Sequence, residues 1–576
     1  MSETRYLPYG ISDFTRVMAE SYYYVDKTRY IPQIERKASF LFFTRPRRFG
    51  KTLWISMLSA YYDRARKERF GELFGNLWIG SHKTALQGKY LMLTLDFSKV
   101  ESDAESLKSS FDEYMRFRLD AFMDKYGELF PERIANRFYD STSASAKLTI
   151  LDQAAKDLQL PLYLIVDEYD NFTNTVLNEK GEEVYHAITH ADGFYRDVFK
   201  KFKGMFERII LVGVSPVTLD DLTSGYNIGW NITMDSDFNQ MLGFSEEEVR
   251  EMLTYYKEAG ETPEGFDIEK TIEEMKPWYD DYCFSQEAYE HQSRVFNSDM
   301  VLYYMSDIMV KKRPPLQMLD RNTGTDYKKL KKLLQLDSLD GDRKGVLHKI
   351  IEEGQIVADV EDSFPASMLT EPRMFTSLLF YYGMLTIKGI DADRTVLGIP
   401  NNNVRKLYYE YLIEEYNKEC GIETTELSDA LTRMAVKGEW KAAIKYLANE
   451  YAKISSVRDG IDGERNIQGF FMAYLSSCKN YLLAPELELN HGYCDFFLLP
   501  DLSRYPSTRH SYIIELKYLP KKDWAAKAAD QWKDAVAQIG RYAAAPRVEA
   551  LRQGTELHKV VVQFCGWEVK RMEEVE

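Results

Sequence analysis

The sequence predicts an α/β protein with a parallel sheet in its N-terminal part, a largely helical middle and a second α/β domain at its C-terminal end. Three observations indicate this class. Short apolar strands alternate with helices over residues 1–235, a pattern typical of a parallel sheet covered on both faces. The segment that follows is mostly helical and charged. Residues 455–576 again carry strand signals, in the order helix, strand, strand, strand, helix, strand.

The N-terminal strands are short apolar runs, each bounded by a turn or a helix. The expected strands cover residues 39–44, 90–97, 162–166 and 208–214. A helix is expected over 52–64, directly after the first strand, and Pro131 breaks an otherwise helical stretch between the second and third strands. These elements define a predicted domain over residues 1–235.

The first strand runs into a turn with the chemistry of a phosphate-binding loop, Thr44-Arg45-Pro46-Arg47-Arg48-Phe49-Gly50-Lys51-Thr52. Such a loop directs backbone N–H groups at phosphates, with a lysine on the terminal phosphates and a hydroxyl on Mg²⁺. Arg45 stands where the first glycine of Gly-x-x-x-x-Gly-Lys-Thr usually lies, and a chance Gly-Lys-Thr in a basic turn is the alternative. The predicted nucleotide-binding residues of the loop are Arg47, Arg48, Phe49, Gly50, Lys51 and Thr52, and Arg45 adds to the same cluster of positive charge.

Two further strand ends supply acidic and hydroxyl groups. The strand 162–166 ends in Asp167 and Glu168, which predicts Asp167 as a Mg²⁺ ligand together with Thr52, and Glu168 as the residue that positions the attacking water. The alternative is a pair of solvated acids. Ser215 follows the fourth strand and is expected beside the γ-phosphate, or else as an ordinary turn hydroxyl. The expected cofactors are therefore ATP and Mg²⁺.

The middle of the chain divides into three predicted segments without a flexible linker. Residues 236–344 read as a helical lid, 345–407 as a small helix-plus-hairpin module with a winged helix as one candidate form, and 408–454 as a helical bridge. Trp278, Tyr282 and Phe284 form an aromatic cluster in the lid. We expect it to be core rather than a platform that stacks bases.

The C-terminal domain, predicted over residues 455–576, brings acids and a lysine together. Glu515 and Lys517 lie two residues apart in an apolar strand and therefore share one face, which Asp495 can reach from the preceding strand. Carboxylates that hold Mg²⁺ or Mn²⁺, next to a lysine that orients water or offsets phosphate charge, predict a metal-dependent phosphodiesterase. The alternative is a surface ion pair on an edge strand.

Composition sets limits on partners and compartment. The net charge of −16 argues against a protein that coats nucleic acid but allows one basic cleft. The cysteines, 5 in all, show no paired spacing, and no signal core or membrane-spanning run is present, so a cytoplasmic protein without membrane contact is expected. The 8 histidines include no pair at a metal-ligand spacing and are expected to be incidental.

Several segments resemble the AAA-ATPase-like family common in gut bacteria: Tyr24-Val25-Asp26-Lys27-Thr28, Arg45 to Thr52, Val166-Asp167-Glu168-Tyr169-Asp170, Gly213-Val214-Ser215-Pro216 and Gly243-Phe244-Ser245, with Phe380 to Leu385 and Ile399-Pro400-Asn401 further on. The resemblance covers almost the whole chain, and the arginine-rich loop is this family's own variant. It implies an AAA-like P-loop domain that binds ATP and a C-terminal PD-(D/E)XK domain of restriction-endonuclease-like fold.

The same resemblance implies roles in the C-terminal domain. Asp495, Glu515 and Lys517 match the Asp…Glu-x-Lys core, Glu464 fits an extra metal-binding acid on the preceding helix, and Gln538 fits a polar residue on the following helix. Glu486 or Glu488 is the alternative to Glu464. The arginine that often precedes the aspartate is missing here, because Tyr493 and Cys494 stand before Asp495.

Together these features predict an ATPase that is coupled to, or gates, a metal-dependent nuclease acting on DNA or RNA. The alternative is a nucleotide-sensing switch whose nuclease-like domain binds a partner or nucleic acid without cutting. A bacterial source is expected, and the sequence is compatible with a homo-oligomer.

Overall fold

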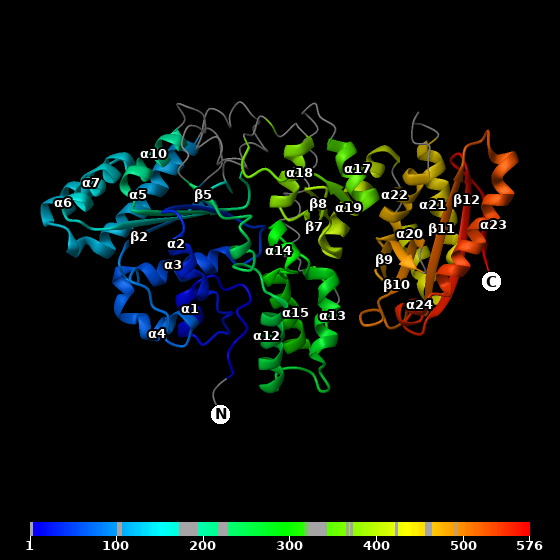
Figure 1. Cartoon of the computed structure of the whole chain (residues 1–576), viewed down its shortest axis with the longest axis horizontal. Coiled ribbons are helices and arrows are strands. Elements are labelled where there is room, and N and C mark those ends of the chain that lie inside the picture. The colour runs from blue at the N-terminus through cyan, green and yellow to red at the C-terminus, as the bar shows by residue number, and fades with distance from the viewer. Residues whose placement is uncertain are drawn as a thin grey trace. The chain divides into compact units, whose positions relative to one another are not determined.

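The computed structural model describes residues 4–100, 106–171, 194–216, 229–315, 317–319, 343–364, 368, 372–420, 424–455, 464–489 and 492–575, and Figure 1 traces the chain. The chain forms two compact units. One comprises Met1–Arg313, Gln317–Leu347 and Gln355–Asn402, and the other Pro314–Leu316, His348–Gly354 and Asn403–Glu576. The finer domain boundaries given above stay predictions. Within the described ranges, no helix combines the length and the apolar character needed to cross a bilayer.

A parallel sheet with the strand order β2-β3-β4-β1-β5 is the centre of the N-terminal unit. Its strands are β1 (Phe40–Thr44), β2 (Leu91–Asp96), β3 (Leu162–Asp167), β4 (Arg208–Gly213) and β5 (Trp230–Asn231). Every pairing is parallel, so the carboxyl ends of β1, β3 and β4 meet at one edge. β3 is buried along its whole length, as expected for a central strand made of a continuous apolar run.

Helices pack on both faces of this sheet, with α5, α7 and α10 on one side and α1, α3 and α4 on the other (Figure 1). Their bounds are α1 (Phe14–Ala19), α2 (Ile31–Arg36), α3 (Lys51–Tyr62), α4 (Phe70–Phe74), α5 (Leu107–Tyr126), α6 (Glu132–Tyr139), α7 (Ala144–Asp157) and α10 (Phe194–Met205). Pro131 lies between α5 and α6, where the break was predicted.

The helical region that follows has its own apolar core, and it belongs to the same unit. Its helices are α12 (Glu246–Glu258), α13 (Ile268–Tyr279), α14 (Gln286–Glu290) and α15 (Ser298–Lys311). Ser245 caps α12 in a capping box with Glu248, which fixes where this helix begins.

A small antiparallel sheet with the order β6-β8-β7 comes next. The elements here are α17 (Arg343–Glu353), β6 (Gln355–Val357), α18 (Pro372–Tyr381), β7 (Thr386–Asp391) and β8 (Arg394–Gly398). The sequence predicted the β7–β8 hairpin, whereas β6 extends that pair to a third strand.

The C-terminal unit contains a mixed sheet with the order β13-β12-β11-β10-β9. Its elements are α19 (Asn402–Cys420), α20 (Thr424–Lys437), α21 (Trp440–Ser455), α22 (Glu464–Leu475), β9 (Tyr481–Leu489), β10 (Gly492–Pro500), β11 (His510–Leu519), α23 (Trp524–Ala543), α24 (Pro546–Leu551), β12 (Glu556–Cys565) and β13 (Glu568–Glu574). β11 and β12 are parallel and the other neighbours antiparallel. The predicted class, with a parallel sheet, a helical region and a second α/β sheet, is confirmed.

The two faces of the C-terminal sheet carry different neighbours. Ile513 of β11 and Val561 of β12 pack in one apolar cluster with Trp532 and Ile539 of α23. The hydroxyl of Tyr512 donates to the carbonyl of Met434 on α20, on the opposite face. Because side chains alternate along a strand, the odd-numbered residues of β11 face α23 and the even-numbered ones face α20.

Candidate functional site

The loop between β1 and α3 turns sharply at Arg48 and Gly50, whose φ angles are 71° and 85°. Lys51 opens α3 and is 5% exposed. Its Nζ donates to the carbonyl oxygens of Arg45 and Pro46, each at 3.0 Å. Burial lowers the pKa of Lys51, and the carboxylates of Glu168 and Asp167 oppose that shift. A buried amine held only by loop carbonyls can exchange these contacts for phosphate oxygens at the start of a helix.

Two predicted metal ligands meet at the carboxyl end of β3. The hydroxyl of Thr52 donates to Asp167 Oδ2 at 2.9 Å, and the backbone N–H of Glu168 donates to Asp167 Oδ1 at 3.0 Å. Burial and the neighbouring charge of Glu168 raise the pKa of Asp167 to about 6. A hydroxyl and a carboxylate are hard oxygen donors of the kind that Mg²⁺ prefers, and a cation would favour the charged form of Asp167. These donors therefore fit Mg²⁺.

Glu168 has a left-handed backbone, with φ of 51°. This conformation is costly for a residue with a Cβ, and such strain is characteristic of functional sites. The side chain of Glu168 lines a cavity of about 560 Å³ together with Lys51, Thr52 and Asp167. Asp170, which is 1% exposed, accepts the backbone N–H of Ser215 at 2.7 Å and so ties the end of β3 to the end of β4.

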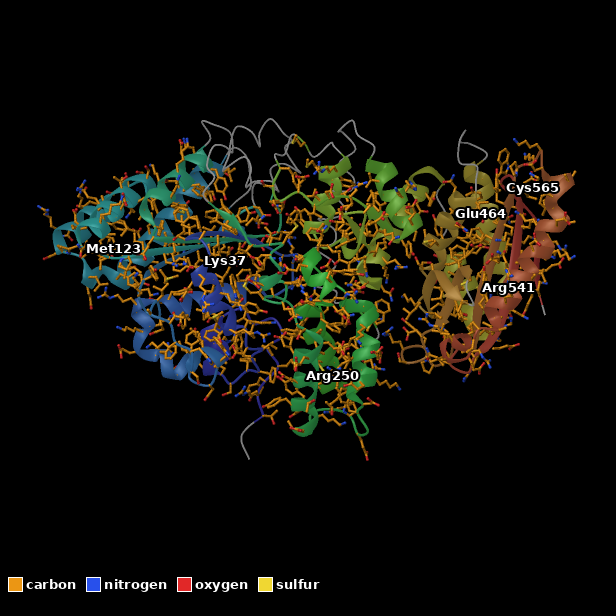
Figure 2. The ribbon with its side chains drawn as sticks, in the orientation of Figure 1. Lys37, Met123, Arg250, Glu464, Arg541 and Cys565 are labelled. Atoms are coloured by element: carbon orange, nitrogen blue, oxygen red, sulfur yellow. The ribbon has the colours of Figure 1, made fainter. Side chains whose placement is uncertain are left out.

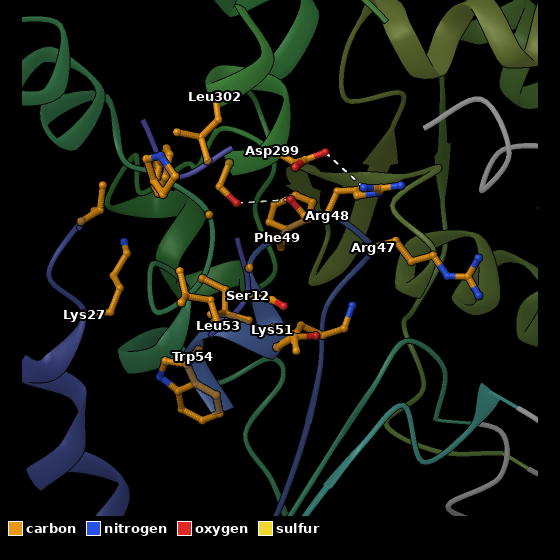
Figure 3. Close-up of a pocket in the computed structure, with 18 of the residues that line it drawn as sticks. Ser12, Lys27, Arg47, Arg48, Phe49, Lys51, Leu53, Trp54, Asp299 and Leu302 are labelled. Carbon is orange, nitrogen blue, oxygen red and sulfur yellow. Dashed lines mark hydrogen bonds and ion pairs between the residues drawn. The ribbon is translucent and has the colours of Figure 1, made fainter. Parts of the chain in front are cut away.

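The same cavity also has apolar lining residues. They are Tyr24, Val25, Leu242, Met252 and Leu302. Figure 3 shows Leu302 on the far side of the pocket from Lys51. A cavity lined by basic, polar and apolar residues fits a ligand that joins charged phosphates to a flat base.

Residues of the Tyr24-Val25-Asp26-Lys27-Thr28 segment hold the wall of this cavity. Lys27 Nζ lies 2.6 Å from Glu248 Oε2 and donates to the carbonyl of Gln240 at 2.9 Å. Asp26 accepts the backbone N–H groups of Thr28 and Trp78. The buried ion pair joins the N-terminal segment to α12, so the segment shapes the pocket.

The predicted arginines separate into different roles. Arg47 and Arg48 line the cavity, and Arg48 Nη1 lies 3.5 Å from Asp299 Oδ2. Figure 3 shows Arg47 extending away from that pair. Arg45 is 1% exposed and lies between the rings of Phe43 and Phe284, with centroid distances of 4.5 and 4.2 Å. Arg45 therefore packs in the core instead of facing phosphates, contrary to its expected place in the charge cluster.

Phe49 of the loop and Ser215, which follows β4, are both buried. The ring of Phe49 meets Tyr282 and Phe284 edge-on at 5.0 and 5.7 Å, so its contribution to a nucleotide would come from its backbone. Tyr282 and Phe284 of the aromatic cluster therefore pack in the core. Ser215 is fully buried, with a side-chain hydrogen bond to Tyr382. Its role as a phosphate sensor stays a prediction.

In the C-terminal unit, the antiparallel pairing of β10 and β11 places Asp495 opposite Glu515. Phe496 is in register with Ile514, and the backbone N–H of Asp495 points to Glu515 Oε2 at 3.5 Å. Asp495 Oδ2 accepts the N–H of Leu516 at 2.6 Å, and Lys517 Nζ donates to Glu515 Oε1 at 2.7 Å. The two carboxylates and the amine thus form one cluster.

Burial shifts the pKa values of the side chains in this cluster. Glu515 is 1% exposed, while the Lys517 side chain is 15% exposed. Burial is the largest cause of the raised pKa of Asp495, and the charges of Glu515 and Glu464 add to it. Burial also raises the pKa of Glu515. For Lys517 burial acts in the opposite sense, but the carboxylates outweigh it and raise the pKa. Oxygen donors that repel one another in this way fit a divalent cation.

Glu464 and Gln538 come from the helices beside this cluster. Glu464 is the first residue of α22 (Figure 2), and its charge reaches Asp495, Glu515 and Lys517. Gln538 is half-buried on α23, one turn before Tyr542. The metal-binding role of Glu464 and the catalytic role of Gln538 stay predictions.

Sequence reasoning missed Gln468, whose Nε2 donates to Asp495 Oδ1 at 2.9 Å. Gln468 lies four residues after Glu464 on α22, so both occupy one face of the helix. This four-residue spacing from Glu464 was the feature of the sequence that could have identified Gln468. Gln468 donates to one oxygen of Asp495 and the N–H of Leu516 to the other, so these two hydrogen bonds orient the carboxylate.

Two family models match the parts of the chain that contain the candidate sites. Residues 8–223 match the family model described as "Predicted AAA-ATPase", and residues 462–574 match the model of the PD-(D/E)XK nuclease superfamily. The chain is thus similar to AAA-ATPase-like proteins over its N-terminal part and to the PD-(D/E)XK nuclease superfamily over its C-terminal part. It is also 26% identical over 286 residues to the "Uncharacterized protein in vnfD 5'region" of Azotobacter chroococcum mcd 1. The match covers 49% of each chain, so the chain spans about half the length of that relative.

Proposed function

We propose that this protein is an ATPase whose nucleotide state gates a metal-dependent nuclease acting on DNA or RNA. The observation that carries the nuclease assignment is the single cluster of Asp495, Glu515 and Lys517, with its amine on the more exposed side. ATP and Mg²⁺ are the proposed ligands of the N-terminal unit, and Mg²⁺ or Mn²⁺ that of the C-terminal unit.

At the N-terminal site, loop amides and Lys51 would bind the phosphates, while Thr52 and Asp167 would hold Mg²⁺. The metal would neutralise charge on the terminal phosphates. Glu168 would accept a hydrogen bond from the attacking water, since it lines the cavity beside Lys51 and Asp167. The apolar lining residues, Leu302 among them, would receive the adenine base.

The phosphate loop also touches segments outside the parallel sheet, which supports the gating part of the proposal. The hydroxyl of Ser298, at the start of α15, donates to the carbonyl of Arg48 at 3.2 Å. A Cβ on Gly383 would lie 2.8 Å from Pro46 Cγ, so the turn after α18 packs directly on the loop. A movement of the loop on ATP binding would therefore displace both the helical region and the small sheet module.

At the C-terminal site, Asp495 and Glu515 would hold the metal, with Glu464 as a third acid. The metal would polarise the phosphodiester and lower the pKa of bound water. Lys517 would release its contact with Glu515 and donate to a phosphate oxygen or to the attacking water. Gln468 would keep the Asp495 carboxylate oriented during these exchanges.

The test is cleavage of single- and double-stranded DNA and RNA with Mg²⁺ or Mn²⁺, with and without ATP. Three full-length variants complete it: Lys51→Ala, Asp495→Ala and Glu515→Ala. We expect metal-dependent cleavage by the parent that changes with ATP. Lys51→Ala should remove the response to ATP, and each carboxylate variant should remove cleavage while ATP binding, measured by calorimetry, persists.

The parts of the proposal fail separately. Cleavage that survives both carboxylate changes would refute the nuclease site, whereas unchanged ATP affinity in Lys51→Ala would refute the nucleotide site. A parent that cuts nothing with either metal, but binds ATP, would indicate a binding switch. A cleavage rate that is the same with and without ATP would refute only the proposed gating by ATP.

A further inference from the structure

A second cluster of metal-binding side chains lies on the other face of the C-terminal sheet, away from the nuclease acids. His510, Glu556 and His558 place one donor atom each within 4.8 Å of one another. His510 is the first residue of β11, and Glu556 and His558 are the first and third residues of β12. Glu574 of β13 lies behind them. The proposed nuclease chemistry uses none of these residues.

Strand register explains why these residues meet. In the parallel pairing of β11 and β12, His510 is opposite Glu556 and Tyr512 is opposite His558. Glu574 is near because β13 pairs with β12 in the antiparallel sense, with Val560 opposite Glu574. The even-numbered residues of β11 and β12 face α20, whereas Glu515 and Lys517 face α23. The two clusters are therefore separated by the sheet.

Hydrogen bonds direct the lone pairs of the histidines. His558 Nδ1 lies 2.7 Å from Glu574 Oε1, and Trp440 Nε1 donates to the other oxygen of Glu574 at 3.1 Å. A carboxylate accepts only, so Nδ1 of His558 carries the proton and its Nε2 presents a lone pair. That Nε2 lies 2.9 Å from Nδ1 of His510, so one proton is shared between the two rings.

We propose that His510, His558 and Glu556 form a Zn²⁺ site, in which the metal replaces the proton shared by the two histidines. His510 Nδ1, His558 Nε2 and a carboxylate oxygen of Glu556 are the ligands, and water completes the coordination. Two histidines and a glutamate are a donor set that zinc favours over Mg²⁺. Glu574 supports His558 from behind, in the carboxylate–histidine–metal arrangement of many zinc sites.

The geometry needs little change to accept the metal. Two nitrogens bound to zinc at ~2.05 Å in a tetrahedral arrangement lie roughly 3.3 Å apart, so the 2.9 Å histidine pair must open slightly. The Glu556 side chain is 69% exposed and its Oε2 is already 3.4 Å from His510 Nδ1, so it is free to close on the metal. Gly438, at the end of α20, allows His510 this position, because a Cβ there would lie 3.0 Å from the ring.

The experiment measures Zn²⁺ affinity of the full-length chain by competition with a chromophoric chelator, after treatment with a stronger chelator. All proteins carry Asp495→Ala and Glu515→Ala, so that zinc cannot bind at the nuclease acids. We expect one tight site in this background. His558→Ala and Glu556→Ala should weaken binding at least about 10-fold, and Glu574→Gln by about 10- to 100-fold. Co²⁺ should give the visible absorption of a four-coordinate nitrogen and oxygen site.

Glu556→Ala is the decisive variant, because its exposed side chain can be removed without disturbing the core. His291→Ala, which removes an exposed histidine of the other unit, is the matched control and should keep the affinity of the background protein. Affinity should fall as pH decreases, since His510 must lose its proton to bind metal. Parent-like affinity in both His558→Ala and Glu556→Ala, or no tight site in the background protein, would overturn the proposal and leave a hydrogen-bonded histidine pair.

Discussion

Replacing Asp167 by asparagine should stabilise the nucleotide-free protein while it removes Mg-ATP binding. The carboxylate is 4% exposed and has a raised pKa of about 6, compared with 3.8 for an ordinary aspartate, because of burial and of Glu168. A carboxyl group whose folded pKa is raised binds its proton more tightly in the folded state. The free energy of unfolding therefore falls as pH rises from about 4 to about 6, and it stays low above that.

The size of the effect follows from this shift. A difference of about 2 pKa units costs about 3 kcal/mol above pH 6 and roughly half of that at pH 5. Asparagine cannot titrate, but it weakens the hydrogen bonds from Thr52 and from the Glu168 N–H, at about 1 kcal/mol each. The net expectation for Asp167→Asn is a gain of about 1 kcal/mol at pH 8 and about zero at pH 5. The pKa of Asp170 is raised to about 6 by burial and by Glu168, but this group is present in both proteins and cancels.

Denaturant unfolding at the two pH values measures the difference, using the transition that Mg-ATP shifts in the parent as the marker of the N-terminal unit. Asp152→Asn is the matched control, because Asp152 pairs with Lys156 at an exposed i,i+4 spacing on α7 and should contribute little. If Asp167→Asn is less stable than the parent at pH 8, or if the difference does not change with pH, the buried charge of Asp167 does not destabilise the folded protein as predicted.

Four further substitutions test the remaining assignments. Glu168→Gln should keep Mg-ATP affinity and stop phosphate release; turnover at the parent rate would make Glu168 a structural acid. Lys517→Ala should slow cleavage by at least about 100-fold with metal affinity largely kept, which metal titration separates from the rate. Gln468→Ala should lower the cleavage rate through Asp495 without changing ATP affinity, and equal effects on both would indicate a folding defect. Gly243→Ala should destabilise the N-terminal unit by about 1–3 kcal/mol. Gly243 has φ of 79°, and a Cβ there would lie 2.8 Å from the carbonyl oxygen of Phe296. An unchanged unfolding midpoint would contradict this prediction.

The strands of the parallel sheet could be predicted because they are buried on both faces. The expected strand 162–166 is observed as Leu162–Asp167, and 39–44 as Phe40–Thr44. β13 was missed, since Glu568–Glu574 is a charged, mostly exposed edge strand whose sequence carries no apolar run. β5 was missed because two residues are too short for any pattern.

In the candidate sites, the sequence predicts contacts within one strand but not contacts between residues far apart in the chain. Glu515 and Lys517 share a face because the strand period is two, which the sequence alone dictates. Arg45 was misplaced because its neighbour Phe284 is far away in sequence, and only the fold reveals that the guanidinium is enclosed by rings. His510 and His558 meet through the register of parallel strands 48 residues apart, and no spacing rule anticipates that contact.

Strand β11 would serve both proposed sites through alternate residues, so the number of residues in this strand would affect function. Inserting one residue between Tyr512 and Glu515 would turn Glu515 and Lys517 toward α20 while His510 kept its place. A two-residue insertion would restore the face but move the acid by one pleat, out of line with Asp495. We therefore expect insertions and deletions in this domain to be tolerated in the segment before His510 and in the loops. We expect them to be absent from the strand itself.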